Sequence, residues 1–215
     1  ISFFNLFSYL STRTILSTLT SLLLVLIFGE GFIRLISSFQ FNQTFDGRAP
    51  NRHMVKHGTP TMGGILIVSS VLISGILWGN LFDKYLILGL ICIVGFAIIG
   101  FIDDYKKVKI ESSKGLSSIE KIFFQSILAG IISISLFMLA ESKNELIYIV
   151  PFFKNIALDL GIFFIFISIF IIVGSSNAVN LTDGLDGLAI LPVILIASAL
   201  GIIAWAAGNV IASDY

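Results

Sequence analysis

Residues 85–109 read YLILGLICIVGFAIIGFIDDYKKVK. The run from Tyr85 to Ile102 has no charged residue, and two aspartates and a group of lysines follow it directly. A helix that crosses about 30 Å of hydrocarbon needs about 20 mostly apolar residues, because each residue rises about 1.5 Å and the backbone must satisfy its own polar groups. This stretch therefore predicts a membrane-spanning helix that delivers carboxylates and lysines to one membrane face.

The rest of the chain has the same character. Of its 215 residues, 56% are hydrophobic and only 12% are charged, and the mean hydropathy is +1.01. Soluble domains carry roughly a quarter charged residues, so the composition excludes an ordinary soluble enzyme and a disordered chain. Thirteen basic and thirteen acidic residues cancel, which leaves no basic field to attract nucleic acid.

Six apolar stretches are candidate spans, and no internal repeat or β-barrel pattern accompanies them. They cover residues 15–36, 62–82, 85–102, 122–140, 160–179 and 188–208. The expected fold class is therefore all-α, a polytopic transmembrane helix bundle that forms one domain over residues 1–215. A shorter apolar piece, 146–153, contains Pro151 and is too short to cross, so we expect it at the interface.

Basic residues are distributed unevenly between the two sets of loops. Four lie on the side that also holds the N-terminus: Arg13, Lys84, Lys143 and Lys154. Nine lie on the other side: Arg34, Arg48, Arg52, Lys56, Lys106, Lys107, Lys109, Lys114 and Lys121. The positive-inside rule makes this second side cytoplasmic and places the N-terminus outside. The polar loop 174–187 falls on the cytoplasmic side as well.

Asp103 and Asp104 are the first candidate functional residues. Two carboxylates near the C-terminal end of a helix meet the negative end of its dipole, which is unfavourable. Neighbouring lysines or a bound cation must compensate, and carboxylates with substrate phosphates form a common Mg²⁺ site. The alternative is a solvated pair that closes the helix at the membrane interface, and the pair by itself does not decide between the two.

The loop 174–187, GSSNAVNLTDGLDG, is more specific. Its polar residues recur every three positions, at Asn177, Asn180, Asp183 and Asp186. Gly184 and Gly187 favour a break in the helix because of their conformational freedom, and an extended or tightly wound segment would bring the polar groups into one pocket. We favour this over a simple polar turn.

The loop before the second span, FDGRAPNRHMVKHGTPTMGG (45–64), is irregular and rich in Gly, Pro and Thr. Lys56 suits a phosphate and Thr61 offers a hydroxyl, whereas Arg48 and Arg52 are explained by topology alone. Carboxylates, lysines and glycines at one membrane face are typical of phosphoryl transfer, in which positioning and charge neutralisation do most of the work. The residues thus predict a membrane enzyme that handles phosphates, without naming its substrate.

Four motifs carry a resemblance to a known family: HGTPTMGG (57–64), GFIDDYKKV (100–108), KGLS (114–117) and NAVNLTDGLDGLA (177–189). In this order they are similar to the polyprenyl-phosphate sugar-1-phosphate transferases, and PTMGG points to the muramoyl-pentapeptide branch. The resemblance implies transfer of phospho-MurNAc-pentapeptide from UDP-MurNAc-pentapeptide to undecaprenyl phosphate, which gives lipid I and UMP. It also implies a Mg²⁺ requirement, a homodimer and the bacterial cytoplasmic membrane.

The resemblance also implies roles for single residues. Asp103 is the candidate base on the lipid phosphate, and Asp104 lies beside it in the catalytic cleft. The other implied residues bind substrate, either at the nucleotide-sugar site (Lys56, Thr61, Asn180 and Asp183), near the uracil (Gly184, Leu185 and Asp186) or at the diphosphate (Lys107 and Lys114).

Members of this family continue past the sixth span, with a further cytoplasmic aspartate associated with magnesium. We therefore expect residues 1–215 to be the N-terminal portion of a longer transferase, inactive alone, with the main metal ligand beyond Tyr215. Two other readings stay open. One is a related transferase that passes GlcNAc-1-phosphate to the same lipid, and the other is a transporter or a non-catalytic membrane binding module, although the spans carry few of the central charges that transport pathways use.

Overall fold

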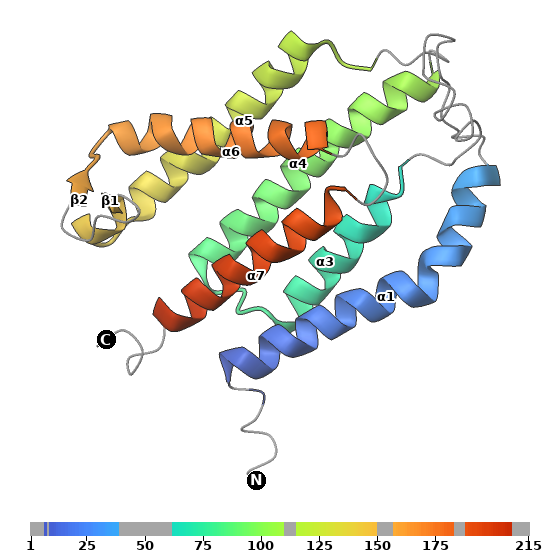
Figure 1. Cartoon of the computed structure of the whole chain (residues 1–215), viewed down its shortest axis with the longest axis horizontal. Coiled ribbons are helices and arrows are strands. Elements are labelled where there is room, and N and C mark those ends of the chain that lie inside the picture. The colour runs from blue at the N-terminus through green and yellow to red at the C-terminus, as the bar shows by residue number, and fades with distance from the viewer. Residues whose placement is uncertain are drawn as a thin grey trace. The chain divides into compact units, whose positions relative to one another are not determined.

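The computed structural model describes residue 7 and residues 9–38, 62–109, 115–149, 157–182 and 188–207 (Figure 1). Six α-helices lie in these ranges: α1 (Leu10–Ser38), α3 (Gly64–Trp78), α4 (Lys84–Lys109), α5 (Ser118–Leu139), α6 (Phe163–Thr182) and α7 (Ile190–Ala207). A short 3₁₀ turn, η2 (Lys143–Leu146), leads into strands β1 (Ile147–Ile149) and β2 (Ala157–Asp159). The predicted all-α bundle is confirmed, with one small hairpin added to it.

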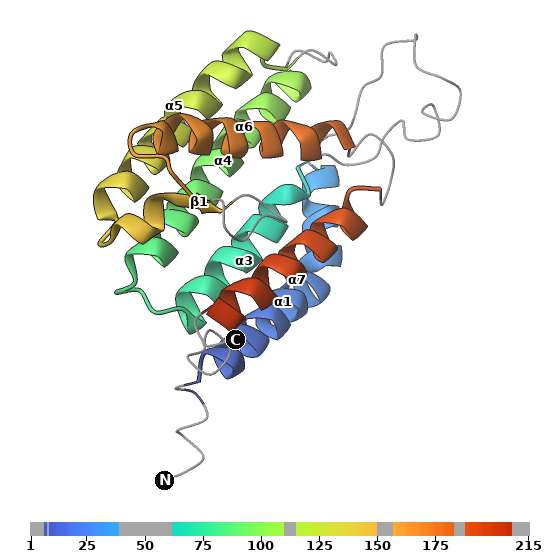
Figure 2. The same cartoon turned by 60° about the vertical axis from the view of Figure 1, so that its left-hand side comes forward.

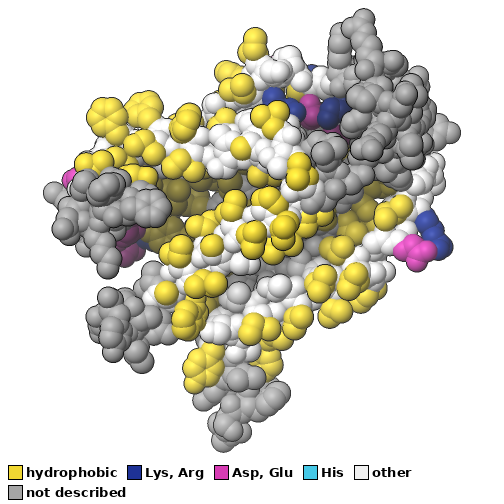
Figure 3. Space-filling model, in the orientation of Figure 1, with side chains coloured by type: hydrophobic (Ala, Val, Ile, Leu, Met, Phe, Trp, Pro, Cys, Tyr) yellow, Lys and Arg dark blue, Asp and Glu magenta, His cyan; other side chains and the backbone are white. Residues whose placement is uncertain are grey.

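Each predicted span coincides with one helix. By length and composition, α1, α4, α5 and α6 can cross a membrane, whereas α3 and α7 are apolar but shorter in the part of the chain that the structure describes. Hydrophobic side chains cover much of the visible helical surface, and the charged side chains gather near helix ends (Figure 3). An apolar exterior of this kind suits hydrocarbon as the surrounding solvent.

The chain divides into two compact units, Ile1–Ile169 and Phe170–Tyr215. In the first unit α1 packs along α3, α3 along α4 and α4 along α5, as both views show (Figures 1 and 2). The second unit contains the last part of α6 together with α7. The expectation of a single transmembrane domain stays a prediction.

Small polar residues, rather than large apolar ones, are buried on α3, which packs along α1. Ser70 and Ser74 of α3 are almost fully buried. The Ser70 hydroxyl lies 3.2 Å from the hydroxyl of Ser21 on α1, and the Trp78 indole N–H donates to Thr20 Oγ1 at 2.9 Å. Membrane helices associate through such small residues and hydrogen bonds, because the surrounding lipid is as apolar as leucine.

A polar network joins the start of α4 to the end of α5. Lys84 Nζ donates to the Leu139 carbonyl at 2.8 Å and to Glu141 Oε1 at 2.6 Å. The Tyr85 hydroxyl donates to Glu145 in η2, and the backbone N–H groups of Glu141 and Ser142 donate to the same carboxylate. These hydrogen bonds, that from Tyr85 first, hold the pKa of Glu145 below its ordinary value.

The hairpin follows this network directly. Strands β1 and β2 pair antiparallel, with Ile147 opposite Asp159 and Tyr148 opposite Leu158. The apolar piece 146–153 that we expected at the interface begins at the last residue of η2 and continues through β1, and its residues 150–153 lie outside the described part. The hairpin follows η2, which is bonded to Tyr85 near the start of α4, the end of this helix opposite Asp103.

Candidate active site

The helix that carries the aspartates does not end at them. α4 continues through Lys109, so its last turn contains Lys106, Lys107 and Lys109. Cations in the last turn of a helix interact favourably with its dipole. The sequence places Lys107 one turn beyond Asp103, at the i, i+4 spacing that brings two side chains together.

Asp103 is buried, with only 5% of its surface exposed. Its Oδ2 lies 2.7 Å from Lys107 Nζ and 3.2 Å from Lys121 Nζ, and its Oδ1 accepts the backbone N–H of Leu116 at 2.8 Å. A buried charge without such partners destabilises the fold by several kcal/mol, about as much as breaking a buried ion pair. The negative charge of Asp103 is therefore compensated by Lys107, Lys121 and the backbone amide of Leu116.

The start of α5 is shaped to receive this carboxylate. Ser117 and Glu120 form a reciprocal capping box that fixes the first turn, and Lys106 Nζ lies 3.7 Å from Glu120 Oε1. At Gly115 a Cβ atom would be only 2.4 Å from Oδ1 of Asp103 and 2.9 Å from its carbonyl oxygen. A glycine is therefore required for the close approach of the two segments.

Asp104 is more exposed than Asp103 but shares a lysine with it. Its side chain is 38% exposed, and its Oδ1 lies 3.0 Å from Lys107 Nζ. Lys107 thus bridges the two aspartates, and Asp104 is the one that opens onto a cleft. The second oxygen of Asp104 has no partner among the described residues.

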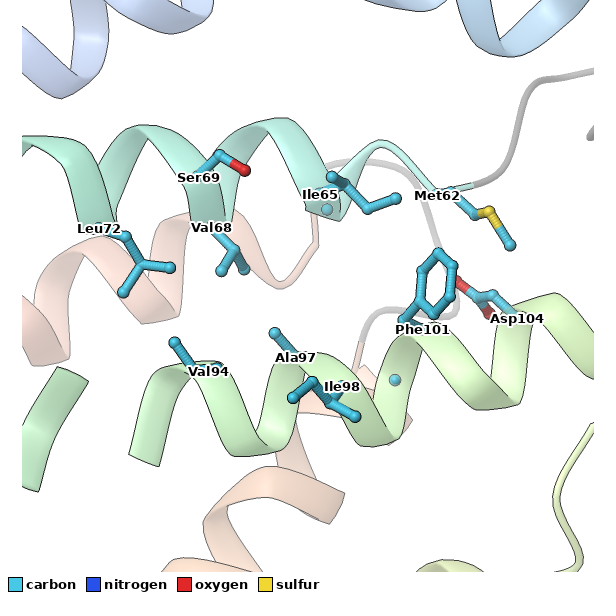
Figure 4. Close-up of a pocket in the computed structure, with 12 residues that line it drawn as sticks. Met62, Ile65, Val68, Ser69, Leu72, Val94, Ala97, Ile98, Phe101 and Asp104 are labelled. Atoms are coloured by element: carbon cyan, nitrogen blue, oxygen red, sulfur yellow. The ribbon is translucent and has the colours of Figure 1, made fainter. Parts of the chain in front are cut away.

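The cleft lies between α3 and α4 and has a volume of about 400 Å³ (Figure 4). Met62, Phe101 and Asp104 lie at one end of it, and Leu72 and Val94 lie toward the other. Met62 has a φ of 69°, in the left-handed region that non-glycine residues rarely adopt. This turn delivers the chain into α3, whose N-cap, Gly63, makes no side-chain capping bond.

The structure brings together three of the predicted site residues, Asp103, Asp104 and Lys107. Asn180 lies on the last turns of α6, in the second unit, and is exposed. The remaining predicted residues lie outside the described part of the chain: Lys56, Thr61, Lys114, Asp183, Gly184, Leu185 and Asp186.

The break predicted at Gly184 and Gly187 lies outside the described residues and stays a prediction. Before it, α6 remains helical through Thr182, and its polar side chains bond back to the preceding turn. Asn177 Nδ2 donates to the Val173 carbonyl at 2.8 Å, and Thr182 Oγ1 donates to the Ala178 carbonyl at 2.8 Å. A helix interior tolerates such polar residues when their side chains bond back to the preceding turn.

Sequence reasoning missed Lys121 and Gly115 as parts of the site. A signal for Lys121 existed, because a cation in the first turn of a helix is unfavourable and so suggests an anionic partner. Nothing local marks Gly115, since its requirement comes from a carboxylate twelve residues earlier that arrives only when α4 and α5 pack.

The described residues offer few ligands for a metal ion. No group of three His, Cys, Asp or Glu side chains gathers in the described ranges. Asp104 offers one hard oxygen ligand near Lys107, and Mg²⁺ is commonly held by one or two carboxylates together with substrate phosphates and water. The residues present therefore fit a shared, substrate-completed magnesium site rather than a cage made by protein alone.

Two comparisons with known proteins agree with this chemistry. The family model for glycosyl transferase family 4 matches residues 86–214, more than half of the chain. Signature 1 of phospho-N-acetylmuramoyl-pentapeptide-transferase matches residues 56–68, and its last residues, from Met62 to Val68, include part of the α3 wall of the cleft. The chain therefore belongs to glycosyl transferase family 4, and with this signature it is a phospho-sugar transferase similar to phospho-N-acetylmuramoyl-pentapeptide-transferase.

Proposed function

We propose that the protein transfers phospho-MurNAc-pentapeptide from UDP-MurNAc-pentapeptide to undecaprenyl phosphate, and so produces lipid I and UMP for peptidoglycan synthesis. One observation carries the proposal most directly. The matched signature runs without a break into α3, and the first turns of α3 face Asp104 across the cleft. Four residues of the signature, Met62, Gly64, Ile65 and Val68, thus line the same cleft as Asp104.

Within this site, Lys107 neutralises charge on phosphate oxygens while Asp104 faces the substrate. Asp103 was predicted as the base on the lipid phosphate. In the geometry described above both of its oxygens are already bonded, so a proton transfer to it requires that one lysine bond be exchanged. Asp104 needs no such exchange, which makes it the better placed proton acceptor.

Mg²⁺ is proposed as the cofactor, held mainly by substrate phosphates and water close to the acidic pair. When bound, the metal would neutralise negative charge on the donor diphosphate. The chain's own contribution is to hold Lys107 and Asp104 in register through the buried contacts of Asp103.

The proposed setting is the bacterial cytoplasmic membrane, with the site on the cytoplasmic side and the N-terminus outside. The support is the excess of lysine and arginine in the loops on the side of Asp103. A homodimer is proposed from the family resemblance alone.

The decisive test is donor-dependent release of UMP by the protein purified as its native gene encodes it. We expect release, with a lipid-linked product, when UDP-MurNAc-pentapeptide, undecaprenyl phosphate and Mg²⁺ are all supplied, and none when the lipid or the Mg²⁺ is left out. Release from UDP-GlcNAc in place of the muramoyl donor would support the related GlcNAc-1-phosphate transferase instead. Release from neither donor would contradict a transferase.

A further inference from the structure

A second cavity lies at the opposite end of α4 from Asp103. It is formed by the first turns of α1, the last turn of α3 and the turn that leads into α4, and its volume is about 370 Å³, within the range of ligand-binding pockets. Asp83, which lines it, stands 20 residues before Asp103, roughly 30 Å at the rise of an α-helix. This cavity is therefore separate from the candidate active site.

Arg13 lines this cavity in an unusual state for an arginine. It lies in the first turn of α1, where a cation meets the positive end of the helix dipole. Its Nε is buried and has no hydrogen-bond acceptor, and its side chain forms no ion pair, within the described ranges. A buried charged donor is unfavourable until an acceptor bonds to it. An anion that enters the cavity would supply this acceptor.

Two neutral donors accompany the guanidinium group. Ser17 lies one turn beyond Arg13 on α1, at the i, i+4 spacing that places two side chains on one helix face. Its hydroxyl has no partner among the described residues. Asn80 Oδ1 accepts the backbone N–H of Phe82 at 3.2 Å, which leaves the amide N–H groups of Asn80 as donors in the cavity lining. Several donors around one cation suit the oxygens of a phosphate.

A carboxylate lies in the same cavity. Asp83 Oδ1 accepts the backbone N–H groups of Tyr85 at 2.8 Å and of Leu86 at 3.0 Å, and these bonds fix its side chain at the start of α4. Its other oxygen bonds to nothing in the described part of the chain, and Asp83 forms no ion pair there with Arg13. The cavity therefore offers a cation and an anion that do not neutralise each other directly.

Trp78 indicates the depth of the cavity in the membrane. It lines the cavity, and its indole N–H donates to Thr20 Oγ1 at 2.9 Å. Tryptophan is enriched where hydrocarbon meets water, at the level of the lipid headgroups. Toward the middle of α1 the exposed side chains are apolar and include Leu19, Leu22 and Leu26. The cavity thus lies at headgroup level, next to a surface that suits acyl chains.

A matching ligand combines a phosphate, a nearby cationic group and an apolar tail. We propose that the cavity binds the headgroup of a zwitterionic phospholipid, phosphatidylethanolamine, from the outer leaflet in the orientation proposed above. Its phosphate accepts hydrogen bonds from Arg13 and Ser17, and its ammonium group donates to Asp83. The lipid then connects the start of α1 to the turn between α3 and α4. Phosphatidylglycerol suits the cavity less well, because its headgroup brings no cation to Asp83.

The inference does not depend on the transferase reaction, so its test is a binding measurement. Phosphatidylethanolamine is titrated into the purified protein in detergent, and bound lipid is followed by native mass spectrometry. We expect Arg13→Gln to weaken the tightest binding step by about tenfold or more, because hydrogen bonds from a cation to the phosphate are lost. Arg34→Gln is the matched control on the same helix, since Arg34 is exposed and pairs with Glu30. Unchanged binding in Arg13→Gln would overturn the proposal.

Asp83→Asn tests the choice of headgroup. Asparagine also caps helices well, so this variant removes the charge and keeps the start of α4. It should weaken the binding of phosphatidylethanolamine severalfold and leave the binding of phosphatidylglycerol unchanged or stronger. Equal weakening of both lipids, or of neither, would overturn the pairing of Asp83 with the ammonium group.

Thermal unfolding guards against misfolding of the arginine variant. Phosphatidylethanolamine should raise the unfolding temperature of the unaltered protein, because a ligand that binds only the folded state stabilises it. In lipid-free detergent, Arg13→Gln should be at least as stable as the unaltered protein, since it removes a buried donor that lacks an acceptor. An equal rise with lipid in both proteins would contradict the site.

Photolabelling locates the ligand and identifies its source. A phosphatidylethanolamine with a diazirine on an acyl chain near the glycerol should label peptides of α1 and α3, and Arg13→Gln should reduce this labelling. Glycerophosphoethanolamine, the same headgroup without acyl chains, should fail to compete at the concentration at which the intact lipid competes. Equal competition would identify a site for a soluble phosphate compound and overturn the proposal, as would labelling that avoids both helices.

Discussion

Asp103 on α4 and Lys121 on α5 form an ion pair in which Oδ2 and Nζ lie 3.2 Å apart. Each residue needs the other, because Asp103 is a buried carboxylate and Lys121 is a cation in the first turn of its helix. The pairing neutralises both charges at once. It also fixes the register of α4 and α5 at the polar end, where Lys107 joins the same carboxylate.

Lys121→Met is expected to destabilise the fold by about 1–3 kcal/mol, because Asp103 loses one of its two cationic partners while it remains buried. The measurement is thermal unfolding of the purified protein in detergent. The matched control is Lys109→Met, since Lys109 pairs with no described carboxylate and should cost less than about 0.5 kcal/mol. Equal losses for the two variants would contradict the assigned role of Lys121.

Gly115→Ala is expected to cost about 1–3 kcal/mol, since the new methyl group would overlap Oδ1 and the carbonyl oxygen of Asp103. The control is Gly31→Ala on α1, where an added Cβ meets nothing within 4 Å and the gain in helix propensity is up to about 1 kcal/mol. The two unfolding temperatures should therefore move in opposite directions. A Gly115→Ala protein as stable as the unaltered one would show that the approach of Asp103 to residue 115 is loose.

The two aspartates should respond differently to loss of charge. Asp104→Asn is expected to lower the rate of UMP release by about 100-fold or more with little change in unfolding temperature, because its side chain faces the cleft. Asp103→Asn should lower both the rate and the unfolding temperature, because it weakens the bonds to Lys107 and Lys121. The check is to measure both quantities on each variant. A stable Asp103→Asn protein with a large loss of rate would restore Asp103 as the base.

Acidification should weaken the network at the opposite end of α4. The pKa of Glu145 is lowered in the folded protein by the hydrogen bond from Tyr85 and by backbone N–H groups. The ionised carboxylate therefore stabilises the fold at pH values above its ordinary pKa, and this contribution is lost as the pH falls through the lowered value.

Glu145→Gln tests this dependence. The difference in unfolding temperature between the unaltered protein and Glu145→Gln should be present at about pH 7 and shrink toward about pH 3. Glu30→Gln is the control, since its carboxylate forms only an exposed i, i+4 pair with Arg34, which contributes little. A difference that stays constant with pH would mean that Glu145 acts through its shape rather than its charge.

Local sequence was enough to predict the helices, because a bilayer requires each membrane-spanning segment to satisfy its own backbone hydrogen bonds. Runs of apolar residues about 20 long can only be helices there, and each predicted span became one helix. The sequence predicted the exact ends of the helices less well. α4 extends past the aspartates to Lys109, where last-turn lysines interact favourably with the helix dipole. α6 extends past residue 179, the predicted end of its span, to Thr182.

The sequence by itself determined that this is a helical membrane protein with an acidic pair and lysines at one end of a long helix, and its motifs identified the family. Only the tertiary structure decided that Asp103 is buried between two lysines while its neighbour Asp104 opens onto a cleft. The physical reason is that adjacent residues on a helix point about 100° apart, so which of them faces a packed helix depends on where α3 and α5 lie. The spacing of residues along the chain shows which side chains share a helix face. It does not show which face packs against a neighbouring helix.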